Sequence, residues 1–339
     1  MARRSLSPAS DDNAESPPRI SGYRVLTGGC WNRVIALGVP EAGPAVDDIT
    51  GPFAGMAGNR AKPSEVILKI SPHENDGDII REYHVLSRFA ELSDFPVPRP
   101  LYLDAPAGRM QVLPGTTLVM TKIPGRVMHS VFGRLSPGER SRVLDQLTED
   151  VIRLHRKKAD GFGGVELPDD KRLASWPRFW LPRLEEVLKA VRDAGVLPEG
   201  VFSEVAELWP FLEELLDIGT ESTLTHYDIW AGNVMIDPGD RQSGAASGAS
   251  ISGYIDIPGN WADYAWEISF MQVFGLADEP FLRRYAEAHG LDESFEERLR
   301  AYQLRTFMKH VMMYPRESYY RQGTELCLDS LRRGAAAWR

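Results

Sequence analysis

Apolar and polar positions alternate through much of the first third of the chain, which is the pattern of half-buried β-strands. Alternation predicts strands over 23–26 and 33–37, a strongly apolar run predicts one over 66–70, and two further segments, 96–103 and 116–123, are also expected to be strands. Gly28 and Gly29 stand between the first two and predict a hairpin turn. Apolar residues at helical spacing predict one helix, over 78–92. This part of the chain is therefore expected to be a small β-rich unit with a single helix.

Beyond Pro124 and Gly125 the apolar residues recur mostly at helical spacing. Ser136, Pro137 and Glu139 predict a capping box at the start of a long helix. Further helices are predicted over 176–194, 201–217, 279–289 and 293–313. A β-like island over 223–237 and 251–257 interrupts them. The pattern thus indicates an α+β chain with a larger, mostly helical second part.

Composition divides the chain further. Residues 1–19 are rich in Ser, Pro and acidic groups and predict a disordered tail. We expect an N-terminal lobe over 20–125, with a Gly/Pro/Ala-rich insertion over 39–64, and a C-terminal lobe over 126–339.

Charge and cysteine content narrow the classes of function. Lys and Arg number 39 and Asp and Glu 48, a net charge of −9, which argues against a nucleic-acid partner and leaves room for a cationic small molecule. Two cysteines fit a reducing compartment. The sequence shows neither a membrane-spanning apolar run nor a secretory signal, so we expect a cytoplasmic protein that binds no membrane.

The β island holds the strongest chemical signal, His226-x-Asp228 followed by Asn233, with Asp256 after the next strand. This spacing is that of a phosphotransferase catalytic loop. Phosphoryl transfer needs a carboxylate that accepts the proton of the attacking hydroxyl, and oxygen ligands for Mg²⁺. The alternative interpretation is a polar turn between two strands.

Lys69 and Glu82 supply a second signal. Lys69 is the only charge in an apolar strand, and Glu82 lies beside the apolar stripe of the 78–92 helix. A Lys paired with a helix Glu is how kinases hold a lysine against phosphates. The alternatives are a Lys on a solvent-facing edge, a Glu that reaches water, and Arg81 as the partner of Glu82.

In this order the motifs resemble the aminoglycoside phosphotransferase and choline kinase superfamily, and within it the fructosamine (ketosamine) kinase branch. The resemblance covers about residues 23–331. The segments that carry it are 26–33 around the glycine turn, Leu154-His155-Arg156 before Gly161-Phe162-Gly163, Trp176 to Trp180, Trp230 in the catalytic loop, and Asp263 and Glu267 after Asp256. The resemblance implies a bilobal protein-kinase-like fold, with a small antiparallel sheet in the N-lobe and a mostly helical C-lobe.

The resemblance also implies roles. Asp228 is expected to be the catalytic base, with His226 shaping its loop. Asn233 and Asp256 are expected to bind Mg²⁺. The residues implied at the ATP site are Gly28, Gly29, Lys69, Glu82, and Lys122 and Ile123 in a hinge over 119–123. Tyr227 departs from the family, which usually has glycine between the His and the Asp.

These observations predict an ATP- and Mg²⁺-dependent kinase that phosphorylates a hydroxyl of a small molecule, as a monomer or weak dimer. Two substrate classes stay open: a ketosamine or amino-sugar-like compound, and an aminoglycoside or nucleoside antibiotic, for which phosphorylation means resistance or self-protection. A pseudokinase without transfer activity is the alternative from another class.

Overall fold

The computed structural model describes residues 22–26, 32–38, 65–73, 76–105, 115–239 and 248–338. The predicted tail over 1–19, the insertion over 39–64, and Gly28 and Gly29 lie outside the described residues. By its internal contacts the chain separates into two compact units. The first holds the residues up to Asp76 and Leu101–Lys122, and the second holds Gly77–Pro100 and the residues from Ile123 onward.

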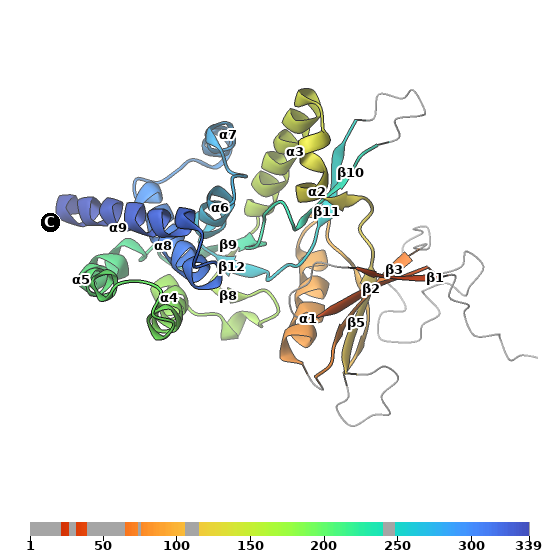
Figure 1. The fold of residues 1–339 in the computed structure, drawn as a ribbon, viewed down its shortest axis with the longest axis horizontal. Helices are drawn as coiled ribbons and strands as arrows, with labels where there is room; N and C mark the ends of the chain where they lie inside the picture. The colour runs from red at the N-terminus through yellow and green to blue at the C-terminus, as the bar shows by residue number, and fades with distance from the viewer. Residues whose placement is uncertain are drawn as a thin grey trace, which may run out of the picture. The chain divides into compact units, whose positions relative to one another are not determined.

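A five-stranded sheet is the main feature of the first unit (Figure 1). Its strands are β1 (Gly22–Leu26), β2 (Arg33–Gly38), β3 (Glu65–Ser71), β4 (Pro100–Asp104) and β5 (Thr116–Thr121), in the order β1-β2-β3-β5-β4. Pairing from β1 to β5 is antiparallel, and Lys69 in β3 stands opposite Val34 and Leu118. This confirms the predicted antiparallel sheet. The predicted strand over 96–103 begins only at Pro100, because Pro96 and Pro98 lack the N–H that a ladder needs.

The second unit is mostly helical, as predicted. Its helices are α1 (Gly77–Leu92), α2 (Met128–Val131), α3 (Pro137–His155), α4 (Trp176–Asp193), α5 (Glu199–Leu215), α6 (Tyr264–Val273), α7 (Glu279–His289), α8 (Phe295–Met313) and α9 (Ser318–Trp338). The capping box at Ser136 is present, with the Ser136 hydroxyl accepting from the Glu139 N–H. Pro182 and Pro210 lie within continuous helices. Helix α1, which the sequence places in the N-lobe, belongs by contacts to this unit, and the predicted lobe boundary stays a prediction.

Two small sheets carry the β island. One has the order β11-β10-β6 and the other β7-β9-β12-β8. Their strands are β6 (Arg126–Val127), β7 (Lys158–Asp160), β8 (Gly163–Gly164), β9 (Glu221–Thr225), β10 (Val234–Asp237), β11 (Ser250–Tyr254) and β12 (Asn260–Ala262). Short 3₁₀ turns cover Phe132–Arg134 and Asp169–Lys171. The predicted island is thus two strands separated by a loop, followed by a hairpin partner.

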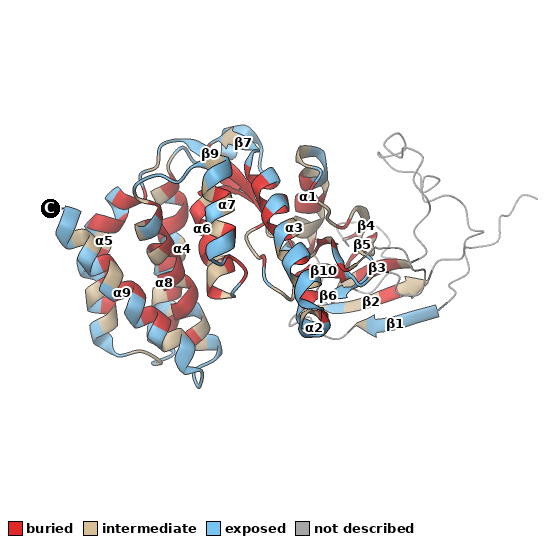
Figure 2. Cartoon of the chain, turned by 90° about the horizontal axis from the view of Figure 1, so that it is seen from above, coloured by how far each residue is buried: buried red, intermediate tan, exposed pale blue. Residues whose placement is uncertain are grey.

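The core of the second unit lies around α8, which contacts α4, α6 and α9 and is buried along much of its length (Figure 2). Trp176 and Trp180 of α4 are fully buried, so they pack the core. No helix among the described residues has the length and apolar character to cross a membrane.

Candidate active site

The predicted catalytic loop connects β9 to β10 and is closed by its own side chains. His226 follows β9, and its carbonyl accepts from the Gly259 N–H at 3.2 Å. Asn233 precedes β10, and its Nδ2 donates to the Asp228 carbonyl at 2.9 Å and to Asp228 Oδ2 at 2.7 Å. Asn233 therefore fixes the end of the loop to Asp228, and the Asp228 carboxylate has one oriented oxygen.

Strand register places Asn233 beside the segment that holds Asp256. In the β10–β11 hairpin Val234 pairs with Tyr254, and the Ile255 N–H donates to the Asn233 carbonyl at 2.9 Å. Asp256 is the next residue and has a left-handed backbone, with φ of 55°. Its carboxylate is close enough to act on Asp228 electrostatically. Residues 20 or more positions apart in the sequence thus lie together at one end of a hairpin, and the role of Asn233 and Asp256 as metal ligands stays a prediction.

His226 is fully buried and serves the loop backbone. Its Nδ1 accepts a hydrogen bond from the Asp228 N–H at 3.1 Å. Burial lowers the pKa of His226 to about 4, although the carboxylates of Glu267 and Asp256 act in the opposite direction. The ring is therefore neutral at pH 7, and because Nδ1 accepts, its proton is on Nε2.

A buried carboxylate on α6 binds the backbone of the catalytic loop. Glu267 Oε1 accepts from the Tyr227 N–H at 2.7 Å, and Oε2 accepts from the His226 N–H at 3.3 Å. His155 of α3 lies 2.7 Å from Oε2 through Nε2, and its Nδ1 lies 2.8 Å from the Tyr285 hydroxyl. Glu267 and His155 are both fully buried. Motif spacing alone does not reveal this role, although a carboxylate inside a buried helix signals a specific partner.

Tyr227, the departure from the family pattern, is strained and tightly packed. Its φ is 70°, a region that residues other than glycine rarely adopt. Its ring stacks on Trp266 with 3.3 Å between ring centroids, and its hydroxyl accepts from Arg305 Nη1 at 3.2 Å. Burial raises the pKa of Tyr227 to about 12, so its hydroxyl is neutral. The Glu267 bond to its N–H and the stacking together hold this conformation.

The pKa of Asp228 is raised to about 7, chiefly by burial and then by the negative charge of Asp256. The hydrogen bond from Asn233 and the charge of Lys309 act in the opposite direction. Among the described residues Oδ1 of Asp228 accepts no hydrogen bond, so it is the oxygen available to a substrate.

A pocket of about 320 Å³ adjoins this loop on the side of Tyr227. Its lining comes from α1, α4, α6, α8 and the segments around 164–167 and 258–260, all within the second unit. Three guanidinium groups line it, those of Arg81, Arg183 and Arg305, against one carboxylate, that of Glu166. Sequence reasoning did not single out the pair Arg183 and Arg305, because only the packing of α4 on α8 brings them together.

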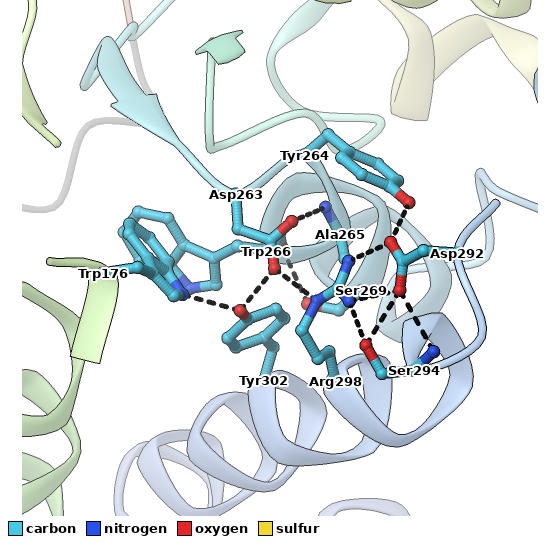
Figure 3. A network of polar contacts seen from close by, with 10 residues as sticks. All are labelled: Trp176, Asp263, Tyr264, Ala265, Trp266, Ser269, Asp292, Ser294, Arg298 and Tyr302. Atoms are coloured by element: carbon cyan, nitrogen blue, oxygen red, sulfur yellow. Dashed lines mark hydrogen bonds and ion pairs between the residues drawn. The ribbon is translucent and has the colours of Figure 1, made fainter. Parts of the chain in front are cut away.

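A buried polar network fixes the start of α6 (Figure 3). Asp263 caps this helix by accepting from the Ala265 N–H at 3.0 Å. Its Oδ2 accepts from Arg298 Nε at 2.8 Å and from the Tyr302 hydroxyl at 2.5 Å. Trp176 Nε1 donates to the same hydroxyl at 2.7 Å. The network positions α6, and with it Glu267 and Trp266.

The residues implied at the ATP site are divided between the two units. Lys69 lies mid-strand in β3 and is half-buried, whereas Glu82 lies in α1 of the other unit. Lys122 follows β5, and its Nζ binds Glu65 Oε2 at 2.6 Å; Ile123 begins the next segment of the second unit. Arg81 binds Glu166 at 2.6 Å and donates to the Pro258 carbonyl at 2.8 Å. The Lys69–Glu82 pairing and the hinge stay predictions.

The donor atoms beside Asp228 fit a hard cation. Asn233 uses its amide nitrogen for both bonds to Asp228, which leaves the amide oxygen for a metal ion, and Asp256 is exposed. Mg²⁺ commonly takes one or two protein oxygens and completes its shell with water and phosphate. In the described part of the chain no three His, Cys, Asp or Glu side chains gather as a metal site, and a Mg²⁺ site of this kind does not need them.

Comparison with known proteins adds the following. A sequence model described as a phosphotransferase enzyme family matches residues 57–245, more than half of the chain. No curated protein matches the sequence significantly. Among solved structures the chain is similar to a protein assigned as a fructosamine-3-kinase from Thermobifida fusca, with a TM-score of 0.64 and 18% identity over 93% of this chain and 95% of that one. It is also similar to a protein with the same assignment from Haemophilus somnus, with a TM-score of 0.61 and 16% identity over 93% of this chain and 92% of that one. A third similar structure is an ADP-bound aminoglycoside phosphotransferase, with a TM-score of 0.55 and 15% identity over 91% of this chain and 93% of that one. These likenesses confirm the kinase-like fold.

Proposed function

Because this chain belongs to the phosphotransferase enzyme family, we propose that it transfers the γ-phosphoryl group of ATP to a hydroxyl of a small molecule, with Asp228 as the catalytic base. Family membership identifies a small-molecule phosphotransferase enzyme; the residues, the nucleotide and the substrate class are proposals. The observation that carries the assignment of residues is the 2.7 Å bond from Asn233 Nδ2 to Asp228 Oδ2, together with the hairpin register that places Asp256 beside them. A polar turn needs neither an Asp–Asn bond nor a second carboxylate.

The proposed reaction uses the two oxygens of Asp228 differently. Oδ2 is held by Asn233, so Oδ1 accepts the proton as the O–H bond of the substrate breaks. The substrate oxygen forms a bond to the γ-phosphorus, and the bond from that phosphorus to the β–γ bridging oxygen breaks. The products are the phosphorylated substrate and ADP. Glu267 and His226 keep the loop rigid while this occurs.

Asn233 and Asp256 are the proposed ligands of Mg²⁺. When bound, the ion supplies positive charge that stabilises the charge developing on the phosphate oxygens. In the first unit Lys69 is the proposed phosphate ligand, with Glu82 as its partner. Gly28 and Gly29 are proposed to contact phosphate, and the backbone of Lys122 and Ile123 the adenine.

A ketosamine or amino-sugar-like compound is the proposed substrate class. It is supported by the motif resemblance along the chain and by the two solved structures assigned as fructosamine-3-kinases. The similarity to aminoglycoside phosphotransferases supports antibiotic phosphorylation as the second candidate. The intact set of Lys69, Asp228, Asn233 and Asp256 argues against a pseudokinase.

ADP release by the full-length protein tests this proposal. The panel holds ketosamines, aminoglycosides and nucleoside antibiotics, each with Mg²⁺ and ATP, and mass spectrometry identifies the product. We expect ADP release with a ketosamine and a product heavier by one phosphoryl group. Mg·ATP binding without transfer to any panel member would instead favour the pseudokinase.

A further inference from the structure

The pocket beside Tyr227 carries more positive charge than its own residues neutralise. Of its three guanidinium groups, that of Arg81 is paired with Glu166, the one carboxylate of the lining. Arg183 and Arg305 have no carboxylate within 4.0 Å in the part of the chain that the structure describes. The carboxylate of Glu186 acts on Arg183 electrostatically but neither lines the pocket nor forms an ion pair with it. Two half-buried cations without a paired anion are costly, unless a ligand supplies the anion.

Neutral groups hold both arginines in place. The Arg183 guanidinium lies over the Phe179 ring, 3.7 Å from its centroid, and donates through Nη1 to the Phe179 carbonyl. Arg305 Nε donates to the Arg183 carbonyl at 3.1 Å, and its Nη1 donates to the Tyr227 hydroxyl at 3.2 Å. Carbonyls and rings orient these side chains while leaving their charge intact. Such preorganised guanidinium groups suit a carboxylate or phosphate.

The two charges also lie close to each other. Burial lowers the pKa of Arg183, and the positive charge of Arg305 lowers it further. Lys309 is one turn beyond Arg305 on α8, and its charge acts on Asp228. The positive potential therefore extends from the pocket towards the proposed base.

Tyr227 connects the pocket to the catalytic loop. Its ring and that of Trp266 line the pocket, its hydroxyl binds Arg305, and the next residue is Asp228. A molecule held by Arg183 and Arg305 therefore lies against Tyr227, the residue that precedes the base. A polycationic acceptor in the same place would meet two like charges.

We propose that the acceptor substrate carries an oxyanion group, a carboxylate or a phosphate, which Arg183 and Arg305 bind beside Tyr227. The inference rests on the proposed function, since it assigns the pocket to the acceptor. If the substrate is a ketosamine, this pocket favours a sugar attached to an amino acid whose carboxylate is free. It disfavours a sugar attached to an amino acid with a blocked carboxylate or to a cationic amine.

Calorimetric titration of the full chain, which needs no turnover, tests the binding. The probes are the matched pair fructosyl-glycine and fructosyl-glycinamide, with fructose 6-phosphate and inorganic phosphate as the phosphate arm. We expect the acid or a phosphate probe to bind at least about tenfold more tightly than the amide. In Arg305→Gln and Arg183→Gln this ratio should fall towards one, and in the control Arg300→Gln, on the same helix but outside the pocket, it should persist.

Three results would overturn the proposal. One is equal or weaker binding of every anionic probe relative to the amide. Another is anion binding that survives both pocket substitutions. The third is loss of anion binding when a non-hydrolysable ATP analogue is present, since the arginines would then serve the nucleotide.

ADP release measured in parallel separates the two proposals. Selective anion binding without ADP release contradicts the phosphotransferase assignment alone. ADP release with equal use of the acid and the amide contradicts the anionic acceptor alone.

Discussion

Glu267 accepts a hydrogen bond from the backbone N–H of Tyr227 at 2.7 Å, so a buried carboxylate of α6 fixes the residue that precedes the proposed base. The same side chain accepts from the His226 N–H and contacts His155. The position of Asp228 therefore depends on a helix that begins eight residues after Asp256.

We predict that Glu267→Gln lowers kcat by about 10- to 100-fold, while KM for ATP changes little. The amide has one acceptor oxygen instead of two, so it cannot satisfy both backbone N–H groups and the His155 ring. Steady-state kinetics measures both constants, and circular dichroism checks folding. An unchanged kcat in a folded variant would show that Glu267 does not position the loop.

A matched pair of substitutions tests whether the left-handed backbone conformation of Tyr227 costs stability. Tyr227→Ala and Tyr227→Gly both remove the stacking on Trp266, but only glycine adopts φ near 70° without steric cost. We expect the glycine variant to be more stable than the alanine variant by about 1 kcal/mol. Urea unfolding measures the difference, and equal stability would mean that the backbone relaxes out of this region.

Asp256→Asn should raise the Mg²⁺ concentration for half-maximal activity by at least about tenfold, because a neutral amide replaces the proposed carboxylate ligand. Asparagine tolerates the left-handed backbone at this position, so folding should be retained. Asp237→Asn, an exposed position at the end of β10, is the control and should leave the Mg²⁺ dependence unchanged. An unaltered Mg²⁺ dependence in Asp256→Asn would exclude it as a ligand.

We predict that the contribution of Asp292 to the stability of the folded protein is lost in acid. Burial disfavours its charged form, but hydrogen bonds and charge from Arg298 outweigh this, and the pKa of Asp292 is held well below its usual range. Its contribution to stability is therefore present above the ordinary aspartate pKa of about 4 and is lost as the pH falls below it. Asp292→Asn should lower Tm by a few degrees at pH 7 and by less in acid. Thermal unfolding across this pH range measures the difference, and the same Tm deficit at every pH would contradict it.

The fold follows from the sequence where one pattern decides it. Alternation predicts β1 and β2, a continuous apolar run predicts β3, and Ser136 with Glu139 marks the start of α3. Helix α6 has no polar face to create a periodic stripe, because seven of its ten residues are buried, so pattern reasoning does not reveal it. Helix α9 is also absent from the helices that the pattern predicts. It contains Gly323, which lowers helix propensity but lets the helix approach Phe307 closely.

The site divides in the same way. His226, Asp228, Asn233 and Asp256 are evident in sequence because one loop and one hairpin fix their spacing. Glu267 and His155 come from α6 and α3, and Arg183 and Arg305 from α4 and α8. Only tertiary packing brings these residues together, so no local spacing predicts their contacts.

The turnover of Asp228→Asn decides whether Asp228 is the catalytic base. Here kcat is measured by ADP release on the substrate found in the panel, and nucleotide binding is measured by calorimetry. The amide keeps the shape of the carboxylate but cannot accept the proton, so we predict a kcat about 100- to 10,000-fold below wild type with ATP affinity largely retained. Asp237→Asn should match the wild type. A kcat near the wild-type value in a folded Asp228→Asn protein would contradict the assignment of Asp228 as the base.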